Sequence, residues 1–274
     1  MDRLRIRPLR DPKDYEDCVM IQREVWLHDD LDITPVHQFC ISAQTGAVLL
    51  GAFVGKAMAG YVYSFPAELN GKFCLHSHHL AVLPEYQGCG IGRRLKRAQL
   101  EEAIRRGYDL ITWTYDPMQA RNANLNLHAL GVVGRTYLDN FYGWTMALML
   151  DVNVPTDRLL VEWQIKSKRV ERKMAGKEKF LNSDKIAGAL EHKPGGNYPR
   201  IWPGRPNLTL GDRRILIELP RNIKDLKPVP GLIARWQKAV RKALKHYFAR
   251  GYRLDDFIFG DRSSYVLKKE RSNP

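Results

Sequence analysis

A glycine-rich turn between an apolar segment and a basic segment holds the residue types best suited to binding a charged ligand. Residues 87–94 read QGCGIGRR and follow an apolar run that stops at Pro84. Glycine costs backbone entropy, so three glycines in one bend indicate that a ligand or another backbone must come close. The first N–H groups of a helix lack internal partners, and the helix dipole is positive there. The turn therefore predicts a phosphate site at a helix start, with positive charge added by Arg93 or Arg94.

The segment before this turn supplies groups that could move a proton. Residues 76–79 read HSHH, and a histidine has a pKa near neutrality, which suits a general base. Strict alternation along a strand would place His76, His78, Leu80 and Val82 on one face. We therefore expect His78 to act as base, with Glu85 of the turn as an alternative. The same alternation sends the histidines to opposite faces, so it argues against a zinc site.

The apolar pattern predicts the elements that would position these groups. Asp11-Pro12 is typical of a helix start, and Gly107 is typical of a residue that ends one. We expect helices over 12–26, 35–43, 91–106 and 121–130, and strands over 4–8, 47–54, 56–65, 73–83, 110–115, 132–137 and 144–152. This order places the glycine turn between a strand and a helix.

Charge is divided unevenly along the chain. Residues 1–150 hold 16 Lys+Arg and 16 Asp+Glu, so residues 151–274 hold the other 28 of the 44 basic and 14 of the 30 acidic residues. The whole net charge of +14 thus lies in the second part. This predicts two units with different roles, and an anionic partner or simply a well-solvated surface for the second one.

The second part contains an echo of the first. We expect strands over 214–219 and 253–259 and a helix over 232–249, and the helix and its flanks read IARWQKAVRKALKHYFARGYRLDDF. The stretch IGRRLKRAQLEEAIRRGYDLITW of the first part likewise runs from a basic helix through Arg-Gly-Tyr into a strand. Chance similarity of two such units and a degenerate second copy are both compatible with this echo.

The motif Gln87-x-x-Gly90-x-Gly92 after LAVLPEY resembles the coenzyme A pyrophosphate loop of the GNAT superfamily of N-acyltransferases. The resemblance covers about residues 1–150. It implies an α/β (α+β) fold with a mixed, mostly antiparallel central sheet flanked by helices. Residues 1–154 would form the acyltransferase domain, and residues 155–274 a basic αβ region that resembles a degenerate second half. The stretches DPMQARNANLNLHALGVVGRTY and PTDRLLVEW resemble a bacterial and archaeal branch that carries such a basic extension.

The resemblance also implies which residues bind acyl-CoA. The turn would hold the pyrophosphate through backbone N–H groups, the strand before it would pair with the pantetheine arm, and an asparagine would contact that arm. The residues in these roles are Leu80, Ala81, Val82, Gln87, Gly88, Cys89, Gly90, Ile91, Gly92, Arg93, Asn122 and Asn124.

One position departs from the family pattern. Many members carry, four residues before the glycine of a Leu-Gly-Phe ending, a tyrosine that protonates the departing thiolate. This chain has LHALGV, with Leu127 at that place. His128, Tyr137 or Tyr142 would then be the general acid, or water would replace it.

These features predict an enzyme that moves an acetyl group, or another acyl group such as succinyl, from coenzyme A to a primary amine of a small molecule. The amine would attack directly in a ternary complex, without a metal ion. A nucleic-acid-binding or RNA-modifying protein is the alternative favoured by the basic second part, and a CoA-binding sensor is the alternative favoured by the missing tyrosine. The sequence has no apolar run of the roughly 18 residues of a membrane span and no signal-peptide pattern, so we expect a cytoplasmic location and no membrane partner. The interpretation leaves room for a homodimer.

Overall fold

A computed structural model of the chain describes residues 4–27, 30–143, 154–177, 181–195 and 198–270. The chain packs into two compact units. Unit 1 comprises Met1–Trp113 with Gln164–Lys166, and unit 2 comprises Thr114–Trp163 with Ser167–Pro274. Packing therefore divides the chain after Trp113, whereas the predicted assignment of separate roles to residues 1–154 and 155–274 stays a prediction. The strand predicted at 144–152 lies outside the described residues.

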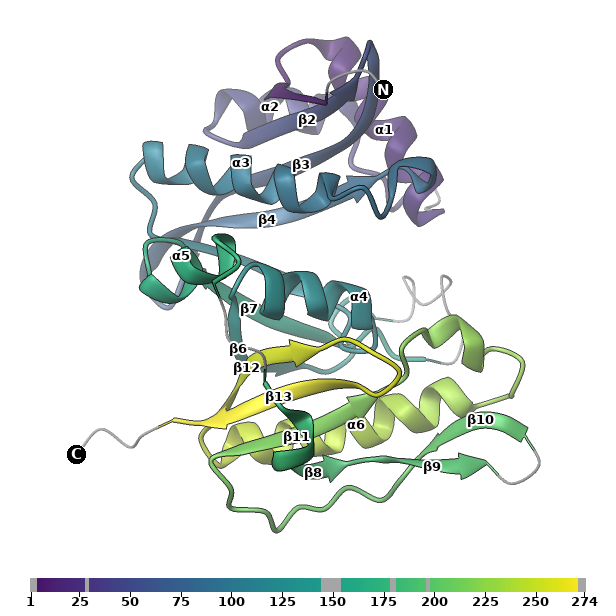
Figure 1. Cartoon of the computed structure of the whole chain (residues 1–274). Coiled ribbons are helices and arrows are strands. Elements are labelled where there is room, and N and C mark those ends of the chain that lie inside the picture. Colours follow the sequence, from purple (N-terminus) through teal and green to yellow (C-terminus); the bar gives the residue numbers. More distant parts are fainter. Residues whose placement is uncertain (1–3, 28–29, 144–153, 178–180, 196–197, 271–274) are drawn as a thin grey trace. The chain divides into compact units, whose positions relative to one another are not determined.

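Unit 1 is built on a mostly antiparallel sheet in the order β1-β2-β3-β4-β5 (Figure 1). Neighbours from β1 to β4 are antiparallel, and β4 and β5 are parallel. These strands are β1 (Arg5–Pro8), β2 (Val48–Val54), β3 (Ala57–Leu69), β4 (Lys72–Val82) and β5 (Leu110–Tyr115), of which the last two residues of β5 belong to unit 2. The arrangement confirms the predicted mixed α/β fold for this part of the chain.

Helices cover both faces of this sheet (Figure 1). On one face α1 (Pro12–Trp26) and α2 (Val36–Gln44) pack over a core that includes Tyr15, Phe39 and Tyr61. The helix α1 begins where the sequence predicts, because the Asp11 side chain accepts a hydrogen bond from the N–H of Lys13. The other face carries α3 (Ile91–Arg105), which turns its apolar stripe to the strands.

The strands of unit 2 are hydrogen-bonded in the order β7-β6-β12-β13-β11-β8. Neighbouring strands in this order are antiparallel, except that β11 and β8 are parallel. The elements of this unit are α4 (Ala120–Ala123), a π-helix (Asn124–Ala129), β6 (Val133–Leu138), β7 (Arg158–Gln164), α5 (Lys168–Met174), β8 (Ala187–Leu190), a hairpin of β9 (His192–Gly195) and β10 (Tyr198–Pro203), β11 (Arg214–Leu219), α6 (Leu232–Ala249), β12 (Tyr252–Ile258) and β13 (Ser263–Lys269). Short 3₁₀ helices cover Pro84–Tyr86 in unit 1 and Ser183–Lys185 and Ile223–Leu226 in unit 2.

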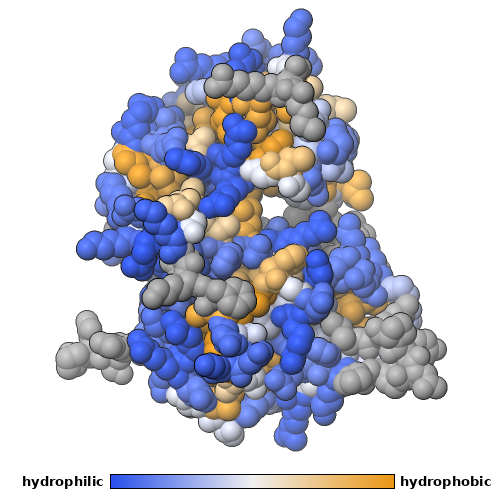
Figure 2. All heavy atoms as spheres, viewed as in Figure 1, coloured by the Kyte–Doolittle hydropathy of each residue, from blue (hydrophilic) through white to orange (hydrophobic). Residues whose placement is uncertain are grey.

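The basic helix α6 is amphipathic and packs against the strands of unit 2. Its buried side chains, among them Trp236, Val240 and Leu244, recur every three to four residues. Its many lysines and arginines leave the other face of the helix polar. Hydrophilic side chains cover most of the face of unit 2 that Figure 2 displays. The charge excess of the second part thus lies largely at the surface of unit 2.

The echo between the two parts holds for the helices but not for the sheets. Both helices begin at a glycine in the left-handed region, Gly90 with φ 77° and Gly231 with φ 72°. A second such glycine follows each helix, Gly107 and Gly251. However, β4 and β5 are direct neighbours, whereas β13 lies between β11 and β12. A degenerate second copy stays a prediction.

None of the helices in the described part of the chain is both long and apolar enough to cross a membrane.

Candidate active site

The predicted glycine turn is an open, exposed bend that leads directly into α3. Gly88 and Gly90 have φ values of 81° and 77°, a region that side chains other than glycine rarely adopt. A Cβ atom added at either position would meet no atom within 4 Å, so free space lies above this backbone. The Gln87 side chain donates a hydrogen bond to the carbonyl oxygen of Val82 (3.0 Å), which ties the bend to the end of β4. The turn is thus a rigid cradle that faces solvent.

The start of α3 gives this cradle its positive character. Gly90 is the N-cap residue, so the N–H groups that follow it belong to the first helical turn, where no internal acceptor exists. The position of a Cβ at Gly92 lies 3.8 Å from Cδ2 of Leu80, which places the Leu80 side chain beside this first turn. Arg94 is exposed and its guanidinium reaches the carbonyl oxygen of Leu4 (3.3 Å). The geometry therefore suits an anion held by main-chain N–H groups.

A β-bulge interrupts β4 at His78. Tyr63 of β3 lies opposite His79 and the next residue, Ser64, lies opposite Ser77, so His78 is the extra residue of β4. Ser77 exchanges hydrogen bonds with the amide of Gln99 on α3 (3.0 and 3.4 Å).

The bulge corrects the predicted alternation of side chains. The His79 ring packs against Trp26 of α1 and Phe39 of α2, with ring centroids 4.9 and 6.4 Å apart. Ser77 and His79 therefore point to opposite faces, although strict alternation placed them on the same one. The grouping of His78 with Leu80 was wrong for the same reason: His78 lies with His79, while Leu80 lies beside α3.

The bulge also coincides with the end of the pairing between β4 and β5. These strands pair only at Leu75↔Ile111 and His76↔Thr112. The strand β4 continues for six residues to Val82, so the edge that faces away from β3 has no ladder partner there within unit 1. Such an edge can accept an extended ligand as an additional strand.

The three histidines of β4 differ in what their ring nitrogens contact. Nδ1 of His76 lies 3.1 Å from Oγ1 of Thr112, and Nδ1 of His79 lies 3.0 Å from the hydroxyl of Tyr61. Within the described part of the chain, the ring nitrogens of His78 have no hydrogen-bond partner. Burial lowers the pKa of His76 to about 4, with smaller contributions from His78 and Lys96.

His78 is neutral at physiological pH and stays accessible. Its ring stacks on His79 with centroids 4.3 Å apart and packs edge-on to Tyr63 at 6.0 Å. Crowding by these rings lowers the pKa of His78 below its ordinary value, although its side chain remains exposed to solvent. A neutral, accessible imidazole without an internal partner is a competent proton acceptor.

Lys96 is a buried cation of unit 1 that the sequence analysis did not single out. Its side chain is 2% exposed, its Nζ donates to Oγ of Ser77 (3.1 Å), and it lies 3.7 Å from the ring centroid of Trp113. Burial holds the pKa of this ammonium well below its ordinary value. The signal was its position beside Leu95 on the apolar stripe of α3, where a charge is unexpected.

The remaining predicted site residues belong to unit 2, and their roles stay predictions. Asn122 is exposed on α4, and Asn124 is half-buried at the start of the π-helix. The imidazole of His128 lies 3.1 Å from a carboxylate oxygen of Asp256. The hydroxyl of Tyr142 lies 3.3 Å from that of Thr114.

Tyr137 has an internal acceptor for its proton. Its hydroxyl donates to the buried carboxylate of Asp157 (2.6 Å), which also receives two hydrogen bonds from Arg241 (2.7 and 2.8 Å). Burial and the charge of Asp157 raise the pKa of Tyr137 far above its ordinary value. These contacts favour a structural role for Tyr137 over that of general acid.

Comparison with known proteins identifies the first part of the chain. Residues 7–132 match the model of the acetyltransferase (GNAT) family. This part belongs to the GNAT N-acetyltransferase family. The family uses acetyl-CoA, which agrees with the predicted cofactor. The remainder of the chain lies outside the family model, and a search of curated proteins gave no match.

Solved structures support the same fold at low sequence identity. An N-acetyltransferase from Staphylococcus aureus Mu50 is 12% identical, with a TM-score of 0.51 over 60% of this chain and 100% of its own. YncA from Salmonella typhimurium, solved with its cofactor acetyl-CoA, is 18% identical, with a TM-score of 0.50 over 61% of this chain and 96% of its own. The GNAT part thus has the family fold, and these likenesses leave the acceptor open.

Proposed function

We propose that the protein transfers an acetyl group from acetyl-CoA to the primary amine of a small molecule, by direct attack of the amine in a ternary complex. The observation that carries this proposal is the open bend at Gly88 and Gly90, which presents the first N–H groups of α3 to solvent. A bend of this shape would be costly if it only joined a strand to a helix.

The residues of unit 1 fit the cofactor. The positions of Gly88 and Gly90 offer the free space that a pyrophosphate needs to approach the backbone, and α3 adds the positive end of its dipole. The unpaired edge of β4 at Leu80, Ala81 and Val82 can pair with the pantetheine arm. Bound acetyl-CoA supplies an activated thioester carbonyl to the amine.

His78 is the base of this proposal. An amine must be neutral to attack a carbonyl, and most alkyl amines are protonated near pH 7, so a group on the enzyme must take the proton. The His78 imidazole is neutral at this pH, accessible, and without a partner among the described residues. His76 and His79 are less suited, because each already contacts a hydroxyl.

We infer that the acceptor approaches on the face that carries α1 and α2. The aromatic rings around His78, namely those of Tyr63, Phe65 and His79, lie on the same face as the cluster packed on Phe39. Leu80 and the α3 start lie on the opposite face. This arrangement would bring the two substrates to β4 from different sides, as direct transfer requires.

A pair of valine variants tests the cofactor site. Gly90→Val places a side chain over the N–H groups of α3, and Gly71→Val is its matched control. Gly71 has nearly the same φ, 76°, and the same open space at Cβ, but lies in the turn between β3 and β4. Each substitution should cost about 1–2 kcal/mol of backbone strain, so the two variants should lose a similar amount of stability.

Acetyl-CoA binding is then measured by calorimetry, and thiol release is measured with a panel of small amines. We expect Gly71→Val to bind like the wild type and Gly90→Val to lose binding. Binding by Gly90→Val within threefold of the wild type would refute the assignment of the loop. Binding of acetyl-CoA without transfer to any amine would favour a sensor, and salt-sensitive binding of a structured RNA without CoA binding would favour the nucleic-acid alternative.

A further inference from the structure

Three cationic side chains form a row across neighbouring strands of unit 2. In the ladder between β11 and β13, Arg214 lies opposite Lys268, and in the ladder between β12 and β13, Arg253 lies opposite the same Lys268. Directly opposed residues of antiparallel strands share one face of the sheet, with their Cβ atoms roughly 4.5–5.5 Å apart. We call these three residues the cation row.

The charge of the cation row is poorly compensated. Within the described part of the chain, the side chains of Arg214 and Lys268 make no ion pair and no hydrogen bond. Arg253 contacts Glu270 at 3.0 Å and Asp255 at 3.7 Å. Both carboxylates are shared with other cations, because Glu270 also pairs with Arg135 and Asp255 also pairs with Arg169. Opposed like charges destabilise a sheet, so a row of three has an energetic cost that needs a reason.

Two buried nitrogen atoms point to the same place. Among the described residues, the buried side-chain atoms that lack a hydrogen-bond partner are Nε of Arg214 and Nε of Arg253. These are the two guanidinium groups that flank Lys268 on either side. Buried polar groups in native proteins are nearly always satisfied, so two such nitrogens on either side of one cation favour the binding of an acceptor at this place.

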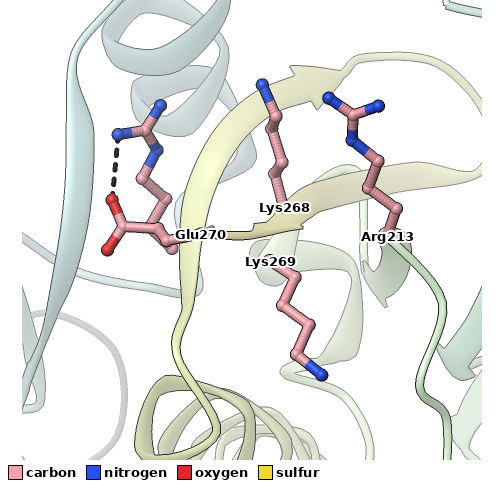
Figure 3. Close-up of a pocket in the computed structure, with 5 residues that line it drawn as sticks. Arg213, Lys268, Lys269 and Glu270 are labelled. Atoms are coloured by element: carbon pink, nitrogen blue, oxygen red, sulfur yellow. Dashed lines mark hydrogen bonds and ion pairs between the residues drawn. The ribbon is translucent and has the colours of Figure 1, made fainter. Parts of the chain in front are cut away.

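A cavity opens at this end of the sheet. It has a volume of about 240 Å³ and is lined by Arg213, Arg253, Lys268, Lys269 and Glu270. Figure 3 shows Lys268 of β13 and Arg213, the residue before β11, extending in the same direction, with Lys269 directed the opposite way. Glu270 closes the side next to Arg253, to which it is bonded in the figure.

We propose that the cation row is a binding site for a phosphate group carried by a small molecule. The ligand would lie over Lys268 in this cavity, where the lining residues Arg213 and Arg253 can donate in the planar geometry that arginine offers to phosphate. Arg214 adds its charge from the position opposite Lys268. A small ligand fits better than a nucleic acid, because Glu270 beside Arg253 would repel a phosphate chain that continued past it. This site is independent of the proposed acetyl transfer.

Lys268→Met tests the site, and Lys238→Met is the matched control. Methionine keeps the length of the apolar stem and removes the charge. Lys238 lies exposed on α6 and makes no hydrogen bond or ion pair with any described residue, so its variant controls for the loss of one positive charge. Inorganic phosphate is titrated by calorimetry at constant ionic strength, with Gly90→Val as background, so that phosphate bound at the glycine turn does not contribute.

Two results of opposite sign are expected from Lys268→Met. Phosphate affinity should fall about tenfold or more, while the Tm in phosphate-free chloride buffer should rise by about 1–3 °C, because the like-charge row is broken. Lys238→Met should leave both quantities unchanged. Unchanged phosphate affinity in Lys268→Met would overturn the proposal. So would binding of a single-stranded RNA oligonucleotide by the wild type without measurable binding of phosphate.

Discussion

Replacement of His78 by glutamine tests the chemical step directly. Glutamine keeps a polar side chain at the bulge but cannot take a proton. A positioned general base typically contributes 10²–10⁴-fold. The His78 side chain is exposed, so water can reach the same place and act in its stead. We therefore expect the lower part of that range, a loss of about 10²–10³-fold in kcat/KM.

The loss of kcat/KM in His78→Gln should depend on pH in a defined direction. The form of His78 that accepts a proton is the neutral one, and crowding lowers its pKa below the ordinary value of 6.5. The ratio of kcat/KM between the wild type and His78→Gln should thus be constant above about pH 7 and should shrink as the pH falls through the lowered pKa. Because both proteins are measured with the same amine, the ratio of their kcat/KM values cancels the effect of ionisation of that amine.

His76→Gln is the matched control, measured by thiol release from acetyl-CoA with the same amine. His76 is two residues away on β4 and contacts Thr112, and its pKa of about 4 keeps it neutral throughout the range. Its variant should retain kcat/KM within a few-fold of the wild type, with no pH-dependent ratio. A ratio below threefold for His78→Gln above about pH 7, or one that does not shrink at any pH below 6.5 at which both proteins stay folded, would refute the assignment of His78 as base.

Three further substitutions test the electrostatics of the two units. Tyr137→Phe removes a hydrogen bond to the buried Asp157 and should lower the free energy of unfolding by about 1.5–3 kcal/mol. Its kcat should be nearly unchanged. A thousandfold loss of kcat in a folded variant would instead support Tyr137 as general acid. Lys173→Met leaves the buried carboxylate of Asp256 without its closest cation (2.7 Å) and should cost about 3 kcal/mol or more in urea unfolding. Burial alone would raise the pKa of Asp256, but the hydrogen bonds from His128 and Lys173 outweigh burial and lower it. The wild type should therefore lose the stabilisation from the ionised Asp256 as the pH falls through that lowered pKa. Lys173→Met should lose less stability over the same pH range. Burial also lowers the pKa of Lys96, so wild-type stability should rise with pH from that value toward the ordinary pKa of lysine, and Lys96→Met should flatten this rise; an equal slope in both proteins would contradict it.

The local features of the site were predictable from the sequence. The helix predicted over 91–106 is observed as Ile91–Arg105, and the strand predicted over 73–83 is observed as Lys72–Val82. Each depends on neighbouring residues alone: the apolar stripe sets the helix, and the glycines set the turn. The open glycine turn follows from the same short-range rules.

The bulge at His78 depends on a partner strand and could not be read in the same way. Whether β4 contains an extra residue is decided by its register with β3, where Ser64 lies opposite Ser77. The consequence is large, because one inserted residue reverses the face of every side chain on one side of it. The choice of His78 as base stays a prediction. Its place on the face opposite Leu80 comes from the register and not from alternation.

The same reasoning explains why the cation row could not be predicted from the sequence, whereas the charge imbalance could. The excess of basic residues after residue 150 is a count, and a count needs no structure. Arg253 follows Arg214 by 39 positions and Lys268 follows Arg253 by 15, and only the registers of β11, β12 and β13 bring the three into line. A surface of well-solvated lysines would spread its charge, because opposed cations repel each other. The alignment of three cations on adjacent strands, two of them with an unsatisfied buried nitrogen, is therefore the part of the charge excess that calls for a ligand.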